Sequence, residues 1–157
     1  MRIRLFQPAD LQTLYEIDQA CFPPGVSYTK GELSRFISNR GARTWVAEEG
    51  GEIVGFLVVG RASQEVGHIV TIDVVSEWRR QGVGGALMNE AEHWARRQGI
   101  KMLYLETAED NLAAQGFYAT RDYIKLEKID HYYSDGNAAW VMGKRLKPER
   151  RRVNSEQ

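Results

Sequence analysis

A β-branched run that breaks into a basic, glycine-rich turn and then into an amphipathic helix constrains this chain more than any other stretch. The run ends at Val75, residues 78–85 read W-R-R-Q-G-V-G-G, and apolar residues recur every fourth position from Val83. Glycine lets backbone N–H groups approach a ligand without interference from a Cβ atom, and a helix N-terminus adds partial positive charge. The stretch therefore predicts a backbone cradle for an anion such as a pyrophosphate, set between a strand and a helix.

Two familiar nucleotide-binding loops do not explain this spacing. A Walker loop requires Gly-Lys followed by Ser or Thr, and a dinucleotide loop requires G-x-G-x-x-G after the first strand. Here the pattern is R-x-x-G-x-G, from Arg79 to Gly84. A tight connection without a ligand is the alternative, but Arg79 and Arg80 place cations where a polyanion would be drawn in.

The segment from Arg79 to Gly84 resembles the acyl-CoA signature of the GCN5-related N-acetyltransferases (GNAT), R/Q-x-x-G-x-G/A. Later segments resemble the L-E-V, N-x-x-A and F/L-Y pattern of the protein N-terminal acetyltransferases related to the ribosomal-protein-alanine enzyme. These segments are Leu105-Glu106-Thr107, Asn111-Leu112-Ala113-Ala114 and Phe117-Tyr118. With earlier matches at residues 8–11 and 22–23, the resemblance covers residues 1–146.

This resemblance implies a fold, a cofactor and an acceptor. The fold is α/β with a mixed central sheet, flanked by helices and splayed at the cofactor site. Residues 1–146 would form this GNAT domain, and residues 147–157 a flexible basic tail. The implied cofactor is acetyl-CoA, with no metal. The implied acceptor is the N-terminal α-amino group of a protein or peptide, a ribosomal protein among the candidates, which attacks directly in a ternary complex.

The resemblance also implies which residues hold the cofactor. Loop amides would bind the pyrophosphate, the strand amides of Ile72 and Val74 would bind the pantetheine and the thioester carbonyl, and Asn111 would bind the pantetheine arm. Asn111 is also an ordinary helix N-cap residue. The cofactor-binding residues expected on this basis are Ile72, Asp73, Val74, Arg79, Arg80, Gln81, Gly82, Val83, Gly84, Gly85, Asn111 and Tyr118.

The chemistry requires a base for the protonated amine and an acid for the leaving thiolate. Glu106 ends a buried strand, where partial desolvation makes a carboxylate a stronger base. His68 competes for this role, as the base or as a water-chain partner of Glu106, because histidine changes charge near neutral pH. Tyr118, the tyrosine of the F/L-Y pair, is the candidate acid. The alternatives at these three positions are a paired carboxylate, a structural histidine and a core tyrosine.

Acceptor recognition is expected from two aromatic segments. By analogy with the N-terminal acetyltransferases, Phe22 and Tyr28 in one corner, and Tyr132 and Tyr133 before the last turn, would flank the first residues of a peptide. Paired tyrosines are also ordinary strand residues. An acetyltransferase of small amines would need an acidic pocket, which residues 22–28 do not supply. A non-catalytic acyl-CoA-binding module would not need an acid and a base.

Length and charge limit the remaining possibilities. The chain of 157 residues suits one core and is too short for two ordinary domains. Its 21 acidic and 21 basic residues give no net charge that would attract nucleic acid, although residues 144–152 are mostly basic. That segment would either dock on an acidic partner such as ribosomal RNA or be a solvated terminus. A single cysteine, Cys21, and the lack of a signal peptide or spanning run predict a cytoplasmic protein without membrane contact.

Hydrophobic spacing predicts alternating strands and helices. Asp10 is expected to cap the first helix, Thr29 and Glu32 to form a capping box for the second, and Gly99 to end the helix after the glycine-rich turn. Family members usually carry Leu-Gly-Phe where this chain has Arg121-Asp122-Tyr123, and Asp122 can adopt a left-handed backbone there at modest cost. Strands are expected at Ile3–Leu5, Thr44–Glu48, Ile53–Gly60, Gly67–Val75, Lys101–Thr107, Tyr123–Tyr133 and Ala138–Leu146, and the later helices at 83–98 and 111–119.

Overall fold

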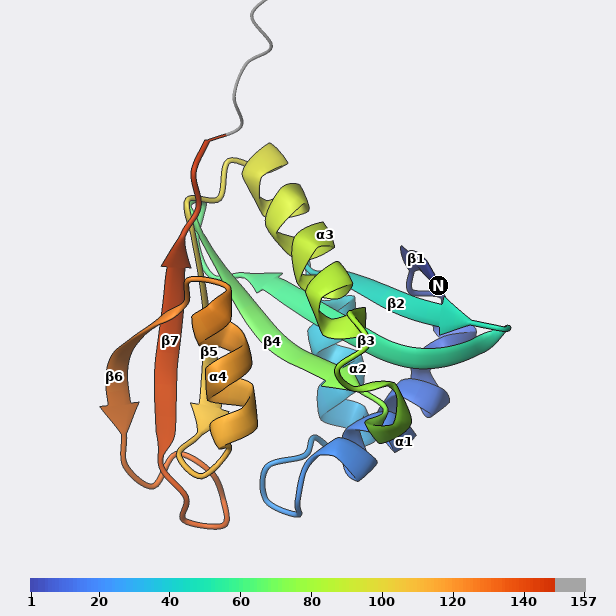
Figure 1. The fold of residues 1–157 in the computed structure, drawn as a ribbon, viewed down its shortest axis with the longest axis horizontal. Helices are drawn as coiled ribbons and strands as arrows, with labels where there is room; N and C mark the ends of the chain where they lie inside the picture. Colours follow the sequence, from blue (N-terminus) through green and yellow to red (C-terminus); the bar gives the residue numbers. More distant parts are fainter. Residues whose placement is uncertain (149–157) are drawn as a thin grey trace, which may run out of the picture.

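The computed structural model describes residues 1–148, whose strands form one mixed sheet with helices on both faces (Figure 1). The strands are β1 (Arg2–Leu5), β2 (Arg43–Glu49), β3 (Glu52–Arg61), β4 (Val66–Val74), β5 (Met102–Ala108), β6 (Ile124–Ile129) and β7 (Ala139–Arg145). The helices are α1 (Leu11–Cys21), α2 (Lys30–Ser38), α3 (Val83–Arg97) and α4 (Leu112–Thr120), with 3-10 turns at Pro8–Asp10 and Ser76–Trp78. From residue 149 onward, the tail expected to be flexible lies outside the described residues.

The sheet has the strand order β1-β2-β3-β4-β5-β7-β6, so β7 lies between β5 and β6. Neighbours are antiparallel except β4 and β5, which are parallel because α3 crosses between them. This parallel pair spans only Val66↔Met102, Gly67↔Leu103 and His68↔Tyr104. Beyond His68 the two strands diverge (Figure 1). The prediction of a mixed α/β sheet flanked by helices is confirmed.

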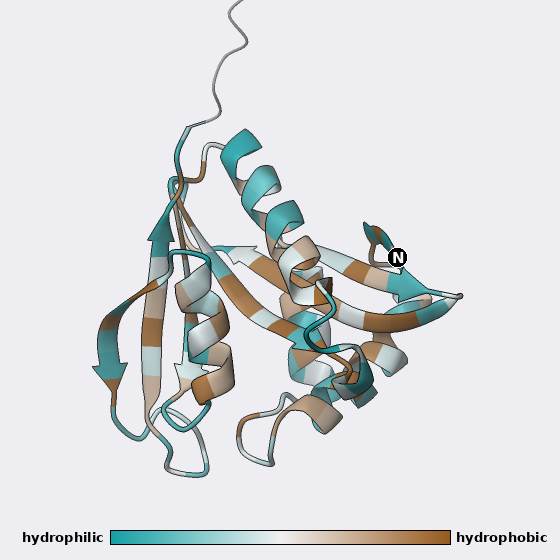
Figure 2. Ribbon diagram, viewed as in Figure 1, coloured by the Kyte–Doolittle hydropathy of each residue, from teal (hydrophilic) through white to brown (hydrophobic). Residues whose placement is uncertain are grey.

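The core lies on both faces of the sheet, because β3 presents alternate side chains to each. Leu57 packs with Leu87 of α3 on one face, whereas Phe56 packs with Leu14 of α1 and Leu33 of α2 on the other. Figure 2 shows apolar residues along β3 and β4 and hydrophilic residues on the C-terminal half of α3. None of the helices in residues 1–148 is long and apolar enough to cross a membrane.

Several local signals in the sequence formed as expected. The capping box of α2 is complete, with the Glu32 amide donating to Thr29 Oγ1 at 3.1 Å and the Thr29 amide donating to Glu32 Oε1 at 3.0 Å. Gly99 ends the α3 turn at φ +77°, and Asp122 adopts φ +73° after α4. These features depend on neighbours in sequence, so they can be recognised without tertiary information.

Asp10 precedes α1 but its side chain does not cap that helix. The residue already has helical backbone angles, φ −79° and ψ −19°, at the end of a 3-10 turn. Its carboxylate accepts two hydrogen bonds from the Arg4 guanidinium, at 2.8 and 3.0 Å, and one from the Gln7 amide at 2.8 Å. The predicted cap is therefore wrong, because an ion pair to β1 takes both carboxylate oxygens.

The last hairpin is shorter than predicted. The strand expected over residues 123–133 ends at Ile129, and His131 adopts a left-handed backbone with φ +54°. Tyr132 and Tyr133 therefore lie in the loop between β6 and β7 rather than in a strand. A loop position frees both rings from the alternation that a strand would impose on them.

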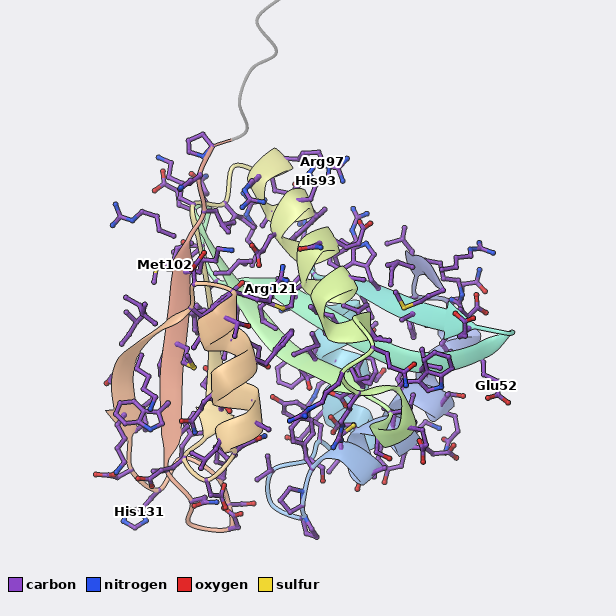
Figure 3. The ribbon with its side chains drawn as sticks, in the orientation of Figure 1. Glu52, His93, Arg97, Met102, Arg121 and His131 are labelled. Carbon is purple, nitrogen blue, oxygen red and sulfur yellow. The ribbon has the colours of Figure 1, made fainter. Side chains whose placement is uncertain are left out.

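A buried charged cluster joins α3 to the C-terminal half of the sheet. Glu92 on α3 is 3% exposed, and its carboxylate lies 2.6 Å from Lys144 Nζ on β7 and 3.6 Å from Arg121 Nη2 after α4. The Tyr123 hydroxyl donates to the same carboxylate at 3.2 Å. Figure 3 places Arg121 between α3 and α4. Lys144, the first residue of the basic segment 144–152, thus belongs to the folded core.

Candidate active site

The divergence of β4 from β5 exposes backbone groups of β4. The Val75 amide donates to Val54 of β3 at 2.9 Å. Since N–H groups alternate along a strand, the amides of Ile72 and Val74 point away from β3, toward the space that β5 has left. The register shift between Val58 and Val59 leaves Val70 as an extra residue in β4. Such a bulge bends its strand, which accounts for the divergence.

Asp73 lies between these two residues but is turned the other way. Its amide faces β3 by the same alternation, and its side chain is 1% exposed. The Asp18 carboxyl group of α1 lies next to its carboxyl group. The Asp73 side chain is therefore part of the contact between β4 and α1.

The glycine-rich turn presents the start of α3 to the same region. Gly82 has φ +85° and is the N-cap of α3, so the first helical amides, at residues 83–85, have no partner within the helix. Arg80 also has a positive φ, +60°, which the sequence did not reveal. Arg79 reaches back, with Nε donating to the Val74 carbonyl at 3.1 Å, and Gln81 Nε2 donates to the Glu77 carbonyl at 2.9 Å. This turn has the geometry of an anion site.

His68 and Glu106, the competing base candidates, are in direct contact. His68 Nε2 lies 2.6 Å from Glu106 Oε2, and both side chains remain partly exposed. The last paired residues, His68 and Tyr104, set this geometry, because Glu106 follows Tyr104 by two positions and faces the same side of β5. The His68 ring stacks on Tyr104 at 4.5 Å. The two residues therefore form one hydrogen-bonded unit, supported by Tyr104, whose contact with His68 no local sequence pattern indicates.

The predicted acceptor tyrosines gather around Glu106. The Tyr132 hydroxyl lies near Glu106, and burial together with the charge of Glu106 raises the pKa of Tyr132 to about 12. Tyr133 meets the Tyr132 ring edge to face at 4.9 Å. Tyr28 donates to the Val70 carbonyl at 3.3 Å, at the bulge of β4. Burial is the main cause that raises the pKa of Tyr28 and of Tyr133, so all three phenols are protonated at neutral pH.

The two segments that carry these aromatic residues touch each other. The α1–α2 segment (residues 22–29) begins at Phe22, where α1 ends, and the β6–β7 loop comprises residues 130–138. Ser134 Oγ donates to the Gly25 carbonyl at 3.1 Å. Gly25 has φ +90°, and a Cβ atom there would lie 3.0 Å from the Asp135 amide nitrogen. Figure 1 shows both segments at the same end of the molecule.

Tyr118 and Asn111 approach the region from α4. Tyr118 is 8% exposed, and its ring meets the Tyr123 ring edge-on at 6.0 Å. Burial raises the pKa of Tyr118, so the phenol keeps its proton at neutral pH. Asn111 is the N-cap of α4, and its Oδ1 accepts from the Ala114 amide at 3.1 Å. The ordinary capping role of Asn111 is therefore present.

Comparison with known proteins identifies this arrangement. The family model described as "Acetyltransferase (GNAT) family" matches residues 11–123. The chain belongs to the GNAT family. An uncharacterized N-acetyltransferase of Methanocaldococcus jannaschii is 30% identical over 146 residues, which are 92% of each chain. An N-alpha-acetyltransferase of Sulfurisphaera tokodaii is 27% identical over 154 residues, covering 90% of each.

A solved relative shares the fold over nearly the whole domain. The crystal structure of Ard1 from Thermoplasma volcanium matches this GNAT protein with a TM-score of 0.84 and 28% identity, covering 93% of this chain and 97% of that one. The protein is therefore an N-acetyltransferase that uses acetyl-CoA as its acyl donor. The unpaired amides of β4 and of the α3 N-terminus suit the amide-rich arm and the pyrophosphate of this donor.

Proposed function

We propose that this GNAT enzyme acetylates the N-terminal α-amino group of a protein or peptide, by direct attack of the amine in a ternary complex. The contact between Gly25 and Ser134 carries this proposal, because it bridges the α1–α2 segment and the β6–β7 loop beside Glu106. A bridged site admits a chain end more easily than an internal lysine, whose chain must leave in both directions. The N-alpha-acetyltransferase name of a relative at 27% identity supports the same acceptor class.

Glu106 and His68 together would act as the base. The amine proton passes to this pair, directly or through a water molecule, so that the nitrogen lone pair can attack the thioester carbon. As the C–N bond forms and the C–S bond breaks, Tyr118 donates a proton to the departing sulfur. The hydrogen bond of 2.6 Å between His68 and Glu106 lets the two side chains share the proton that they accept.

The cofactor and the acceptor would be held by separate surfaces. The amides of Ile72 and Val74 bind the pantetheine and the thioester carbonyl, residues 79–85 bind the pyrophosphate, and Asn111 binds the pantetheine arm. Phe22, Tyr28, Tyr132 and Tyr133 flank the first residues of the acceptor. The free thiol of Cys21 accords with a reducing compartment, and we place the reaction in the cytoplasm.

A panel of acceptors tests this function. Wild-type protein is assayed for CoA release with peptides bearing different free N-termini, ribosomal-protein N-termini among them. The comparison set contains the same peptides with blocked N-termini and an internal lysine, and small amines such as spermidine. We expect acetylation of free α-amines, located by mass spectrometry. Preferred acetylation of the small amines would refute the proposal.

Cofactor binding should depend on the left-handed N-cap of α3. In Gly82→Val a β-branched residue must occupy φ +85°, which costs about 1–2 kcal/mol and displaces the amides that follow. We expect calorimetry to show CoA affinity lower by at least about tenfold, in line with that cost. Gly51→Val is the matched control, since Gly51 has φ +81° in the open β2–β3 turn. Equal CoA affinities in the two variants would contradict the cradle.

Gly25→Val should separate the two segments around the acceptor. The Cβ atom of the new side chain would lie only 3.0 Å from Asp135, and the backbone at this position has a conformation that favours glycine. We expect a higher KM for the acceptor peptide and weaker discrimination against internal lysine, with unchanged CoA affinity. Gly136→Val, at φ +88° in open space within the same β6–β7 loop, is the control. Identical acceptor kinetics in both variants would argue against the bridge.

A further inference from the structure

Two fully buried carboxyl groups lie beneath the site, and neither acts as the base or the acid of the proposed reaction. Asp18 on α1 is 0% exposed and Asp73 on β4 is 1% exposed. The Asp18 carboxyl group lies close enough to that of Asp73 to raise its pKa, so the pair connects the helix that leads into the α1–α2 segment with the strand that presents amides to the cofactor.

Each carboxyl group has one oxygen satisfied and one oxygen left over. The Tyr28 amide donates to Asp18 Oδ2 at 2.8 Å, and Thr71 Oγ1 donates to Asp73 Oδ1 at 2.5 Å. Within the described part of the chain, Asp18 Oδ1 and Asp73 Oδ2 are buried and have no N–H or hydroxyl donor. A buried acceptor without a donor costs free energy, and two adjacent carboxylates repel each other. One proton between these two oxygens removes both penalties.

The groups around the pair do not replace that proton. Burial is the first cause that raises the pKa of Asp73 well above its ordinary value, and the hydrogen bond and the charge of Asp18 follow. Arg79, in the loop after β4, acts in the opposite direction with a smaller effect, and it is already bound to the Val74 carbonyl. Cys21 of α1 and Tyr118 of α4 also face Asp73, and burial keeps both of them protonated at neutral pH.

We propose that Asp18 and Asp73 share one proton and act as a positioning pair, which holds the α1–α2 segment in register with the cofactor-binding edge of β4. Asp18 fixes the Tyr28 amide, and Asp73 lies between the residues whose amides face the acyl donor. Two further contacts join the same two segments. The Tyr28 hydroxyl donates to the Val70 carbonyl, and Cys21 Sγ donates to the Val74 carbonyl at 3.4 Å. The pair thus sets the distance between acceptor and donor. Its kinetic consequences rest on the proposed function, whereas the shared proton does not.

Substitutions at Asp73 separate positioning from simple stability. In Asp73→Asn the side-chain NH₂ donates permanently to Asp18 Oδ1, and the carbonyl still accepts from Thr71, so the bond no longer depends on pH. In Asp73→Leu a side chain of similar size provides no donor. We expect Asp73→Asn to keep the acceptor KM within about threefold of wild type at pH 7, and Asp73→Leu to raise it at least about tenfold, as loss of a buried hydrogen bond implies. CoA affinity should change little in both.

The pH dependence has a definite sign. Because folding raises the pKa of Asp73, the stabilisation is complete below the unfolded pKa and is lost as pH rises toward the folded pKa. Wild type should therefore lose thermal stability, and show a rising acceptor KM, at alkaline pH relative to Asp73→Asn. Carbon-13 NMR of labelled aspartate should detect one protonated carboxyl group at neutral pH, and this signal should be absent from Asp73→Asn.

Hydrogen exchange provides a readout that needs no acceptor. The Tyr28 amide should exchange faster in Asp73→Leu than in wild type or Asp73→Asn, since its acceptor Asp18 loses its partner. If no peptide is acetylated, the proposed function fails, while NMR and hydrogen exchange still test whether Asp18 and Asp73 share a proton.

Ordinary titration of both aspartates would overturn the shared proton. A lower Tm for Asp73→Leu, with unchanged Tyr28 exchange and acceptor KM, would overturn the positioning role. If Asp73→Leu does not fold, the NMR signal and the pH profile of Asp73→Asn decide.

Discussion

Glu106→Gln is expected to lower turnover on the best acceptor peptide by about 10² or more, while CoA affinity changes little. The amide cannot accept the proton of the amine, and the substitution removes the carboxylate that lies 2.6 Å from His68 Nε2. Loss of the base should also flatten or displace the acid limb of the pH–rate profile, since the rate rises with pH until the base is ionised. Steady-state kinetics across pH measure both effects.

The contact between His68 and Glu106 predicts non-additive kinetics. If the two side chains act as one unit, the double variant Glu106→Gln, His68→Gln should lose little more activity than the more damaging single variant. Glu109→Gln is the control, because Glu109 pairs with Lys128 at an exposed position shortly after β5. Near-normal turnover of Glu106→Gln, together with loss of activity in His68→Gln, would assign the base to His68 alone.

Glu92→Leu is expected to lower the free energy of unfolding by about 3–5 kcal/mol, the usual cost of removing one partner from a buried ion pair. Lys144 Nζ and the Tyr123 hydroxyl would lose their shared acceptor, and Arg121 would lose a nearby negative charge. Urea denaturation followed by circular dichroism measures the change.

A second glutamate on α3 provides the control for Glu92→Leu. Glu90 lies two residues earlier on the same helix and is not fully buried, so Glu90→Leu should change the unfolding free energy by less than about 1 kcal/mol. Adding Lys144→Met to Glu92→Leu should recover part of the loss, because it removes the buried charge left unpaired. Equal urea midpoints for Glu92→Leu and wild type would mean that the cluster does not stabilise the fold.

The sequence revealed those parts of the fold that depend on nearby residues. Thr29 and Glu32 form their capping box, and Asp122 adopts a left-handed backbone after α4, where family members usually carry glycine. The glycine-rich turn was recognisable because its conformation and the following helix are encoded within a short stretch. Hydrophobic period likewise located the strands to within a few residues.

Contacts between distant segments were not predictable in this way. The bond between His68 and Glu106 depends on the exact register of the short parallel pair, and the meeting of Asp18 with Asp73 depends on how α1 packs on β4. Asp10 appeared to be a cap because nothing local indicates that Arg4 binds it. In each case tertiary packing determines the partner of the side chain, and local sequence patterns carry no information about that packing.

The short pairing between β4 and β5 has a consequence for how the enzyme responds to its supply of acyl donor. Within residues 1–148, the strand pairing between β4 and β5 comprises three residue pairs, so a donor bound where the strands diverge would contribute new bonds between the two halves of the sheet. A ligand that binds only the folded state stabilises it by RT ln(1 + [L]/Kd), about 2.7 kcal/mol at one hundred times Kd. The stability of the folded protein would then rise with the concentration of acetyl-CoA, in addition to the rate of the reaction.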